Sequence, residues 1–363
     1  MNSRRCKLYF SPDVKTKVED FFDMERELES LKRELLSPNT RMIVVKGIRR
    51  IGKSSLVRVA LNEINIPYIF IDLRSAGPLT PESIYEYFAV ELSKFLGDKG
   101  VRRALSRVRG VQISGSRLDF TERRVSIISQ ALRELSEWAS NKQLILVLDE
   151  AQELKIVRGF DGVLAHIYDH AKGLKVLLAG SEAGLLDKLL GVKDPRAPLF
   201  GRAFSEITLE RLPVERSAEF LRVGFQQAGL KVPEEEVTQA VSKLGGVIGW
   251  LTFYGYLRSK GDDNALDRAL DEGSRMAASE LNSFLSNRQV ARRRYVEVLR
   301  TLTRPSTWSE VKRSLRLIAN VSDKQVSNYL KELVHHGFVE RRGDLYSIAD
   351  PLLVEAVRRG YVR

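Results

Sequence analysis

The sequence predicts an α/β fold with a doubly wound parallel sheet, followed by an all-helical region and a winged helix-turn-helix. Three observations support this prediction. Short apolar runs alternate with helical patterns as far as residue 211, as strands and helices do in a parallel sheet. Residues 212–287 have helical apolar spacing throughout, and residues 288–363 combine helices with one short hairpin. The predicted domains are therefore 1–211, 212–287 and 288–363.

The apolar run 144–148 has no polar alternation, which is typical of a strand covered on both faces. Ligands of such sheets bind at the carboxyl ends of the strands. The strands predicted for the first domain are residues 42–45, 67–72, 144–148, 175–179 and 206–209. The helices predicted for the first two domains are residues 25–36, 55–61, 81–96, 123–140, 218–228, 234–244, 247–258 and 265–285.

The segment Gly47-Ile48-Arg49-Arg50-Ile51-Gly52-Lys53-Ser54 fits the phosphate-loop pattern GxxxxGK[ST]. It lies between a predicted strand and a predicted helix, so loop N–H groups and a helix N-terminus converge on a polyphosphate. Gly47 and Gly52 let the loop wrap, and Lys53 reaches the β- and γ-phosphates. The Ser54 hydroxyl holds Mg²⁺. The sequence therefore predicts that the loop, through Ser55, binds a nucleoside triphosphate.

Two adjacent carboxylates, Asp149 and Glu150, follow the apolar run 144–148. Asp149 is suited to the Mg²⁺ shell, and Glu150 can polarise a water for attack on the γ-phosphate. An alternative is that Asp149 merely caps the next helix. The guanine-specific pattern NKxD is not matched, because the nearest string, residues 141–144, ends in Leu. ATP or ADP is therefore the expected nucleotide.

Two further polar residues are candidates for catalysis. Ser181 follows the strand 175–179 and either senses the γ-phosphate or belongs to a turn or helix N-cap. Arg202 precedes the last strand and either stabilises transition-state charge or forms a surface salt bridge. As a catalytic arginine it can act within its own subunit or on a neighbour, so the sequence leaves the oligomeric state open.

Composition narrows the class of protein. The 363 residues are 43% hydrophobic and 29% charged, and no run of eighteen apolar residues suggests a membrane span. The single cysteine, Cys6, excludes an internal disulfide, and the amino-terminal residues lack the apolar core of a signal peptide. We expect a cytoplasmic protein. A basic stretch predicted as an insertion between sheet elements, with a solvated surface as its simplest interpretation, contains Lys99, Arg102, Arg103, Arg107, Arg109 and Arg117.

The carboxyl-terminal domain is also basic. Residues 288–363 contain 16 basic and 8 acidic residues, against a net charge of +12 for the chain. The run Arg292-Arg293-Arg294 is predicted to mark a linker, and Ser322 to cap a helix over 323–336. Its outer face carries Lys324, Gln325, Asn328 and Lys331, and the following hairpin carries Arg341 and Arg342 at its tip. These side chains can contact double-stranded DNA. The alternative is a winged helix that binds a protein or acts as an intramolecular brake.

The chain resembles the archaeal ATPase family of STAND-type P-loop NTPases, relatives of the AAA+ (ASCE) initiator ATPases. The motifs that carry this resemblance are residues 47–54, 146–153, 178–181, 198–202 and 245–251. The resemblance implies a P-loop NTPase that works as an ATP-driven switch, with a helical lid and a winged helix. Two positions depart from the family: residues 22–27 replace a Gly-Arg-Glu string, and Ile248 stands where the family has Pro.

Two functional hypotheses follow. The first is an Mg²⁺-dependent ATP hydrolase with slow turnover that regulates a DNA-linked assembly. The second is a non-enzymatic, nucleotide-gated interaction module.

Overall fold

The computed structural model describes residues 9–74, 80–122, 124–140 and 142–362, so Cys6 and Asn141 lie outside the described residues. The chain divides into two compact units. One, the sheet unit, consists of Met24–Gly47 and Lys53–Leu209. The other, the helical unit, consists of Met1–Asp23, Ile48–Gly52 and Glu210–Arg363. The described helices include none that is long and apolar enough to cross a membrane.

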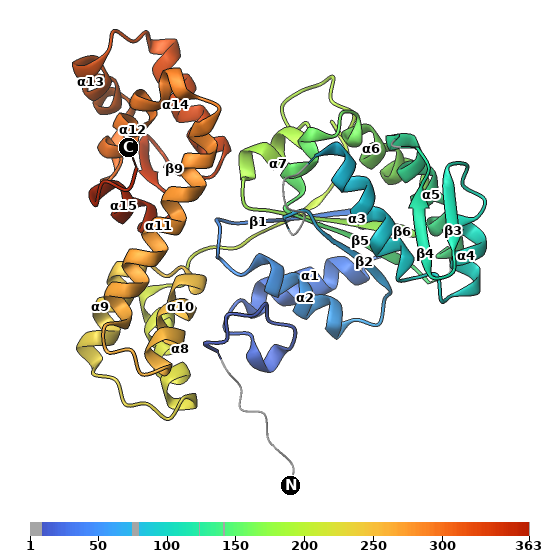
Figure 1. Cartoon of the computed structure of the whole chain (residues 1–363), viewed down its shortest axis with the longest axis horizontal. Coiled ribbons are helices and arrows are strands. Elements are labelled where there is room, and N and C mark those ends of the chain that lie inside the picture. Colours follow the sequence, from blue (N-terminus) through green and yellow to red (C-terminus); the bar gives the residue numbers. More distant parts are fainter. Residues whose placement is uncertain (1–8, 75–79, 123, 141, 363) are drawn as a thin grey trace. The chain divides into compact units, whose positions relative to one another are not determined.

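The sheet unit is built on a five-stranded parallel sheet with the strand order β2-β5-β6-β1-β7 (Figure 1). Its strands are β1 (Met42–Lys46), β2 (Tyr68–Asp72), β5 (Leu144–Asp149), β6 (Leu174–Gly180) and β7 (Ser205–Thr208). All residues of β1, β5 and β6 are buried, as the continuous apolar runs predicted. Because β1, β6 and β5 are adjacent and parallel, their carboxyl ends lie at the same edge of the sheet.

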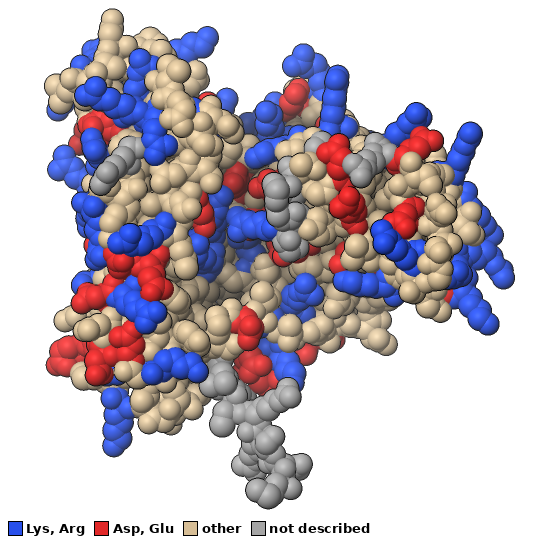
Figure 2. Space-filling model, viewed as in Figure 1, with Lys and Arg blue, Asp and Glu red and all other residues tan. Residues whose placement is uncertain are grey.

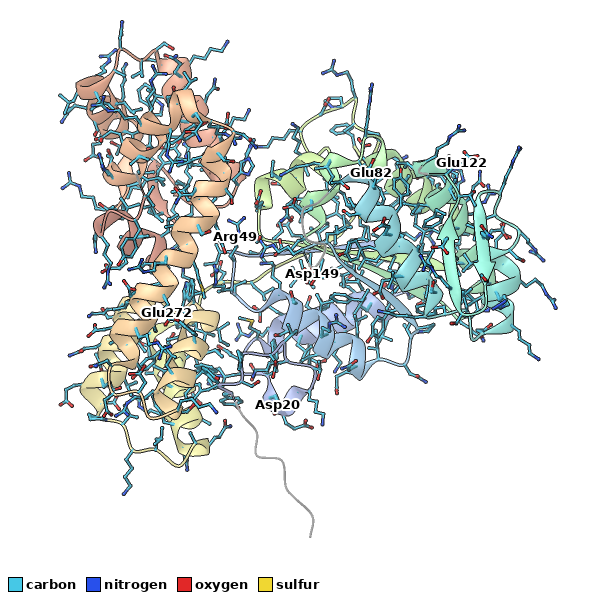
Figure 3. The ribbon with its side chains drawn as sticks, in the orientation of Figure 1. Asp20, Arg49, Glu82, Glu122, Asp149 and Glu272 are labelled. Carbon is cyan, nitrogen blue, oxygen red and sulfur yellow. The ribbon has the colours of Figure 1, made fainter. Side chains whose placement is uncertain are left out.

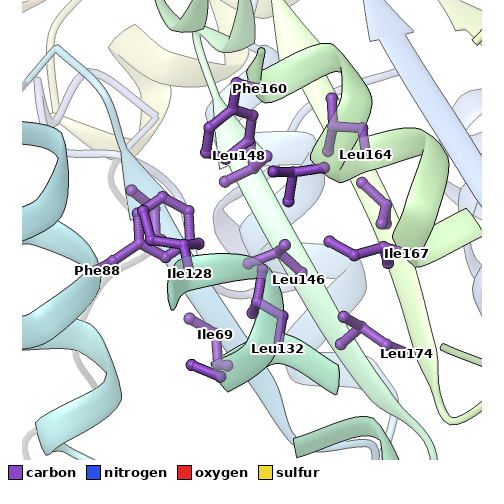
Figure 4. Close-up of a cluster of buried hydrophobic side chains, with 14 of the residues drawn as sticks. Ile69, Phe88, Ile128, Leu132, Leu146, Leu148, Phe160, Leu164, Ile167 and Leu174 are labelled. Atoms are coloured by element: carbon purple, nitrogen blue, oxygen red, sulfur yellow. The ribbon is translucent and has the colours of Figure 1, made fainter. Parts of the chain in front are cut away.

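Helices cover both faces of this sheet (Figure 1). Successive strand residues point to opposite faces, so Leu146 and Leu148 share one face, where they join an apolar cluster with Phe88, Ile128 and Phe160 (Figure 4). Helices that contribute to this cluster include α3 (Pro81–Ser93), α5 (Val125–Trp138) and α6 (Phe160–His170). The remaining helices of the core are α1 (Glu25–Leu36), α2 (Lys53–Glu63) and α7 (Ala183–Leu189), and a 3₁₀ helix, η2 (Ala151–Ile156), follows β5.

The basic stretch is an ordered part of the sheet unit. It forms helix α4 (Lys99–Leu105) and an antiparallel hairpin, β3 (Val111–Ser114) and β4 (Arg117–Phe120). Apolar side chains from this region, Val101, Leu105 and Leu118 among them, are buried in the same apolar cluster as the sheet. The predicted insertion is therefore packed against the core, and its basic side chains face outwards.

The helical unit includes a short 3₁₀ helix, η1 (Val18–Asp20). After residue 209 it continues with the helices α8 (Val214–Gln227), α9 (Glu234–Leu244), α10 (Ile248–Ser259) and α11 (Ala265–Ser286). The next elements are η3 (Gln289–Ala291), α12 (Arg292–Thr301), β8 (Ser306–Thr307), α13 (Trp308–Ile318), α14 (Asp323–His335), β9 (Val339–Arg342), β10 (Leu345–Ile348) and α15 (Pro351–Arg358). The last three strands form one small sheet, β8-β10-β9. The carboxyl-terminal half of α11 contributes Ala277, Leu281 and Leu285 to the core of this winged helix.

Local signals explain two boundaries in this region. Ser322 accepts a hydrogen bond from the backbone N–H of Gln325, whose side chain accepts one from the Ser322 backbone, so a capping box starts α14 where predicted. The linker predicted at Arg292-Arg293-Arg294 is wrong, because these residues form the first turn of α12. Tyr295, directly after them, is buried, so the arginines belong to an amphipathic helix.

Candidate nucleotide and magnesium site

The sheet unit brings the ends of β1 and β5 together at a serine and a carboxylate. Ser54, in the first turn of α2, donates a hydrogen bond from its hydroxyl to Oδ2 of Asp149 over 2.6 Å. Asp149 ends β5 and is buried (Figure 3). Lys53 is buried too, and its Nζ donates to the carbonyl oxygen of Gly47 over 3.0 Å. These contacts place the hydroxyl, carboxylate and ammonium groups of the two predicted motifs at the same sheet edge.

The Glu150 carboxylate is held by three hydrogen bonds and one ion pair. Its Oε2 accepts from Nε2 of Gln152 at 2.6 Å, and from the hydroxyl and backbone N–H of Ser181 at 2.8 and 3.1 Å. Nη1 of Arg74 lies 3.1 Å from its Oε1. Nη2 of Arg74 also donates to the Ser181 hydroxyl over 3.0 Å. Glu150 has a φ of 53°, a left-handed backbone conformation that is strained for a non-glycine residue.

The two adjacent carboxyl groups differ in acidity. Burial is the main influence on Asp149 and raises its pKa, with the Ser54 hydroxyl opposing this and the Glu150 charge adding to it. Burial acts on Glu150 in the same direction, but the charges of Arg74 and Lys53 and the hydrogen bonds outweigh it. They hold the pKa of Glu150 below its ordinary value. Environments that separate the pKa values of paired carboxyl groups are typical of sites where the two have different roles.

Residues 48–52, the middle of the phosphate loop, belong to the helical unit and contact its helices. Nη2 of Arg50 lies 2.7 Å from Oε1 of Glu280 on α11, and Nε of Arg49 lies 3.4 Å from Oε2 of the same carboxylate. The Arg50 guanidinium also lies over the Trp250 ring, 4.2 Å from its centroid. The backbone N–H of Gly249 donates to the Arg50 carbonyl oxygen over 2.9 Å. We call Glu280, Trp250 and Gly249 the loop clamp.

The remaining predicted loop residues have distinct environments. Gly52 has a φ of 99°, so the left-handed region explains a glycine there, and Arg50 has a φ of 63° without being glycine. Ile51 is fully buried. Ile48 lines a small cavity with Arg49, Glu280 and residues of the winged helix, and Ser55 lies in the first turn of α2.

The alternatives left open by the sequence can now be compared with the contacts. Asp149 does not cap a helix, because the residue at the N-cap of η2 is Glu150. Ser181 is not the N-cap of α7 either, since Glu182 occupies that position. Arg202 forms a surface ion pair, the second of its two alternatives: its Nη2 lies 2.5 Å from Oδ2 of Asp169. Among the described residues, Arg202 also donates to the carbonyl oxygen of Pro198, and none of these contacts connects it to Glu150.

The predicted DNA-contacting residues are all exposed on the winged helix. Lys324, Gln325, Asn328 and Lys331 lie on the outer face of α14, and Arg341 and Arg342 lie next to the β9–β10 turn. Some of them have intramolecular partners. Gln325 belongs to the capping box, Nε of Arg341 donates to the Gly343 carbonyl oxygen over 2.8 Å, and Arg342 lies 3.4 Å from Glu340.

Two residues near the predicted motifs were missed from the sequence. Arg74 follows β2, and Glu280 lies within α11, and each is one charged residue among many in its segment. The parallel fold itself carried a signal for Arg74. Because β2 pairs with β5, with Asp72 opposite Asp149, the residues that follow β2 lie near those that follow β5. No comparable signal pointed to Glu280, which lies 230 positions from Arg50 in the sequence.

Two segments of the sequence match known domain families. Residues 21–252 match the model of an ATPase domain family found predominantly in Archaea, and residues 289–349 match the carboxyl-terminal winged helix-turn-helix domain of MCM proteins. No curated protein matches the chain.

Solved structures resemble the whole chain. A Walker-type ATPase of Pyrococcus abyssi is 30% identical, with a TM-score of 0.79 over 97% of this chain and 100% of the other. The Aeropyrum pernix Orc1 protein, solved in complex with DNA, is 17% identical, with a TM-score of 0.49 over 100% of this chain and 99% of the other. The RuvB branch migration motor of Thermotoga maritima is 11% identical, with a TM-score of 0.43 over 96% and 98%.

Proposed function

We propose, from the premise that this chain belongs to the ATPase domain family found predominantly in Archaea, that it is an Mg²⁺-dependent ATP hydrolase. The observation that carries the proposal is the 2.6 Å hydrogen bond between the Ser54 hydroxyl and Asp149. It joins the serine of the phosphate-loop motif to the carboxylate of a strand nearly one hundred positions away. That juxtaposition is what a shared Mg²⁺ ion requires.

The residues fit the magnesium ion that this family implies. Mg²⁺ prefers oxygen ligands, and the Ser54 hydroxyl and the buried Asp149 carboxylate offer them side by side. In the proposal these two residues would hold the ion, which would neutralise negative charge on the bound phosphates. Lys53 binds the phosphates through its ammonium group, and Glu150 accepts a proton from the attacking water. Ser181 positions the Glu150 carboxylate through its two hydrogen bonds.

The test is ATP turnover by purified protein with two substitutions. We expect Lys53→Ala to abolish ATP binding, and Glu150→Gln to retain ATP binding but lower turnover by about a hundredfold or more. Omission of Mg²⁺ should abolish turnover. An unaltered rate in either variant would contradict the assignment of these residues.

A second candidate function is a nucleotide-gated module that turns over ATP very slowly or not at all. The Arg74 ion pair and the hydrogen bonds on Glu150 favour it, because they lower the pKa of the proposed base and occupy its oxygens. A single-turnover experiment separates the two functions. A hydrolase converts bound ATP at the rate seen in steady state or faster, whereas a module retains intact ATP over many minutes.

The proposal extends to what the ATPase regulates. The winged-helix match, the exposed Lys324 and Lys331 and the surplus of positive charge after residue 288 support a contact with DNA phosphates. In this proposal the helical region is the lid of a STAND-type switch in the cytoplasm. Arg202, released from Asp169, adds positive charge during hydrolysis. If the winged helix binds a protein partner instead, a lower salt concentration should not increase its affinity for DNA.

A further inference from the structure

The positive charge of this chain is concentrated in two segments. Residues 94–118 carry seven basic residues and one acidic residue, a net charge of +6, and residues 288–363 carry +8. The whole chain carries +12, so all other residues together carry −2. Basic residues that only increase solubility are normally mixed with acidic ones, as they are in the rest of this chain. The segment 94–118, which we call the basic extension, departs from that pattern.

The basic extension presents its charges from an ordered platform. Its apolar residues Val101, Leu105 and Leu118 are buried in the core of the sheet unit, whereas its seven basic residues are all exposed. Figure 2 shows Lys and Arg side chains gathered along the edge of the molecule where Figure 1 places α4, β3 and β4. These basic residues are Lys94, Lys99, Arg102, Arg103, Arg107, Arg109 and Arg117.

Among the described residues, three of the basic side chains have neither an ion pair nor a hydrogen-bond partner: Lys99, Arg103 and Arg109. Arg102 has no ion pair either, but its Nη2 donates to the carbonyl oxygen of Gly115. The other basic side chains have partners. Arg107 lies 3.8 Å from Glu134, and Arg117 lies 3.0 Å from Asp119. The three unpaired cations are therefore available to an external anion. Five of the seven basic residues are arginines, whose planar guanidinium matches phosphate oxygens in a bidentate geometry.

We propose that the basic extension is a second DNA-binding surface, which contacts the phosphate backbone of duplex DNA without reading its sequence. Its partner is a duplex because the surface lacks stacking platforms for single-stranded bases. Its one aromatic residue, Phe95, is packed against the apolar cluster. The surface belongs to the ATPase unit itself, so it binds DNA independently of the winged helix. The inference extends the proposed DNA contact but does not depend on the proposed role of α14.

The test is the salt dependence of duplex binding by the full-length protein. The extension variant carries Lys99→Gln, Arg103→Gln and Arg109→Gln. Loss of three phosphate contacts should lower the slope of log K against log salt concentration by about 2.7, and affinity at 0.1 M salt about tenfold or more. The matched control carries the same loss of charge at exposed residues of the same unit, Lys155 and Lys193. Its third substitution is Arg158→Gln.

A winged-helix variant distinguishes this inference from the proposed role of α14. It carries Lys324→Gln, Lys331→Gln and Arg342→Gln, and is compared alone and combined with the extension variant. A reduced slope for the extension variant in both backgrounds supports the inference, even if the winged-helix variant binds normally. Equal slopes for the extension variant and its control overturn it, as does a wild-type protein that binds no duplex. Unchanged ATP binding and thermal unfolding of each variant confirm that its fold is intact.

Discussion

Replacement of Glu280 by Gln should increase the affinity of the protein for Mg-ATP. The Glu280 carboxylate binds two arginines of the phosphate loop, Arg49 and Arg50, at 3.4 and 2.7 Å. An incoming triphosphate is attracted to the same two guanidinium groups and repelled by the carboxylate. Gln keeps the size and hydrogen-bonding capacity of the side chain but removes its charge. The competition for the arginines should therefore weaken.

The magnitude follows from the exposure of this pair. A hydrogen bond between charged groups contributes roughly 1.5–3 kcal/mol when well protected from water. The side chains of Arg50 and Glu280 are 24% and 31% exposed, so solvent screening reduces this figure to about 1–2 kcal/mol. Since about 1.4 kcal/mol corresponds to a tenfold change in Kd, ATP should bind roughly 5- to 30-fold more tightly to the variant.

The assay uses the tryptophan of the loop clamp. Trp250 is buried and lies under the Arg50 guanidinium, so displacement of Arg50 should change its emission. In a background with Trp138→Phe and Trp308→Phe, the emission of Trp250 is followed during titration with Mg-ATP. We expect the nucleotide-free Glu280→Gln protein to move towards the emission of the ATP-bound wild type.

The control is Glu272→Gln, the same loss of charge on the same helix (Figure 3). Glu272 pairs with Arg268, one helical turn away and outside the loop. This variant should bind ATP as the wild type does. Weaker binding of ATP by Glu280→Gln would refute the competition argument, because it would mean that Glu280 holds the loop in its binding conformation. An affinity within twofold of the wild type would refute any electrostatic role.

Three further substitutions test other contacts. Arg74→Ala removes the cation that lowers the pKa of Glu150, so the acid limb of the pH–turnover profile should move to higher pH, and turnover at pH 7 should rise severalfold. Gly249→Ala would place a Cβ 2.7 Å from the Cβ of Arg50, so ATP affinity should fall and stability should decrease by about 1–3 kcal/mol in urea unfolding. Lys175→Met removes three hydrogen bonds to the carbonyl oxygens that end α1 and should destabilise the protein by roughly 2–4 kcal/mol, with an unchanged m value.

Much of the sheet unit could be predicted because its signals are local. The run Leu144–Leu148 is buried on both faces of the sheet, and a stretch without polar residues is compatible with few other environments. The capping box at Ser322 likewise needs only residues within one helical turn. The linker prediction at Arg292 failed because it considered only these local charges. Three consecutive charges suggest a solvated connection unless the buried stripe of the following helix is considered with them.

The contacts of the candidate site depend on longer distances in the sequence. The juxtaposition of Ser54 and Asp149 could be inferred because two motifs with known strand contexts imply it. The ion pair between Arg74 and Glu150 could be predicted only from the pairing of β2 with β5. The order of strands along the chain does not give this pairing. The loop clamp required the packing of a helix more than two hundred residues after the loop. Contacts between residues so far apart produce no periodic pattern in the sequence.

The glycines within residues 245–249 are explained by packing contacts with distant parts of the chain. A Cβ at Gly246 would lie 2.2 Å from the carbonyl oxygen of Leu212, and one at Gly249 would lie 2.8 Å from that of Arg50. Both glycines therefore allow close approach of another backbone segment, and the second of these segments is the phosphate loop. Ile248, the departure from the family pattern, lies 3.6 Å from where a Cβ on Gly52 would stand. Residues 48–52 of the loop thus contact α10 and α11 through both their backbone and their arginines, so we expect a change in their conformation to alter this packing.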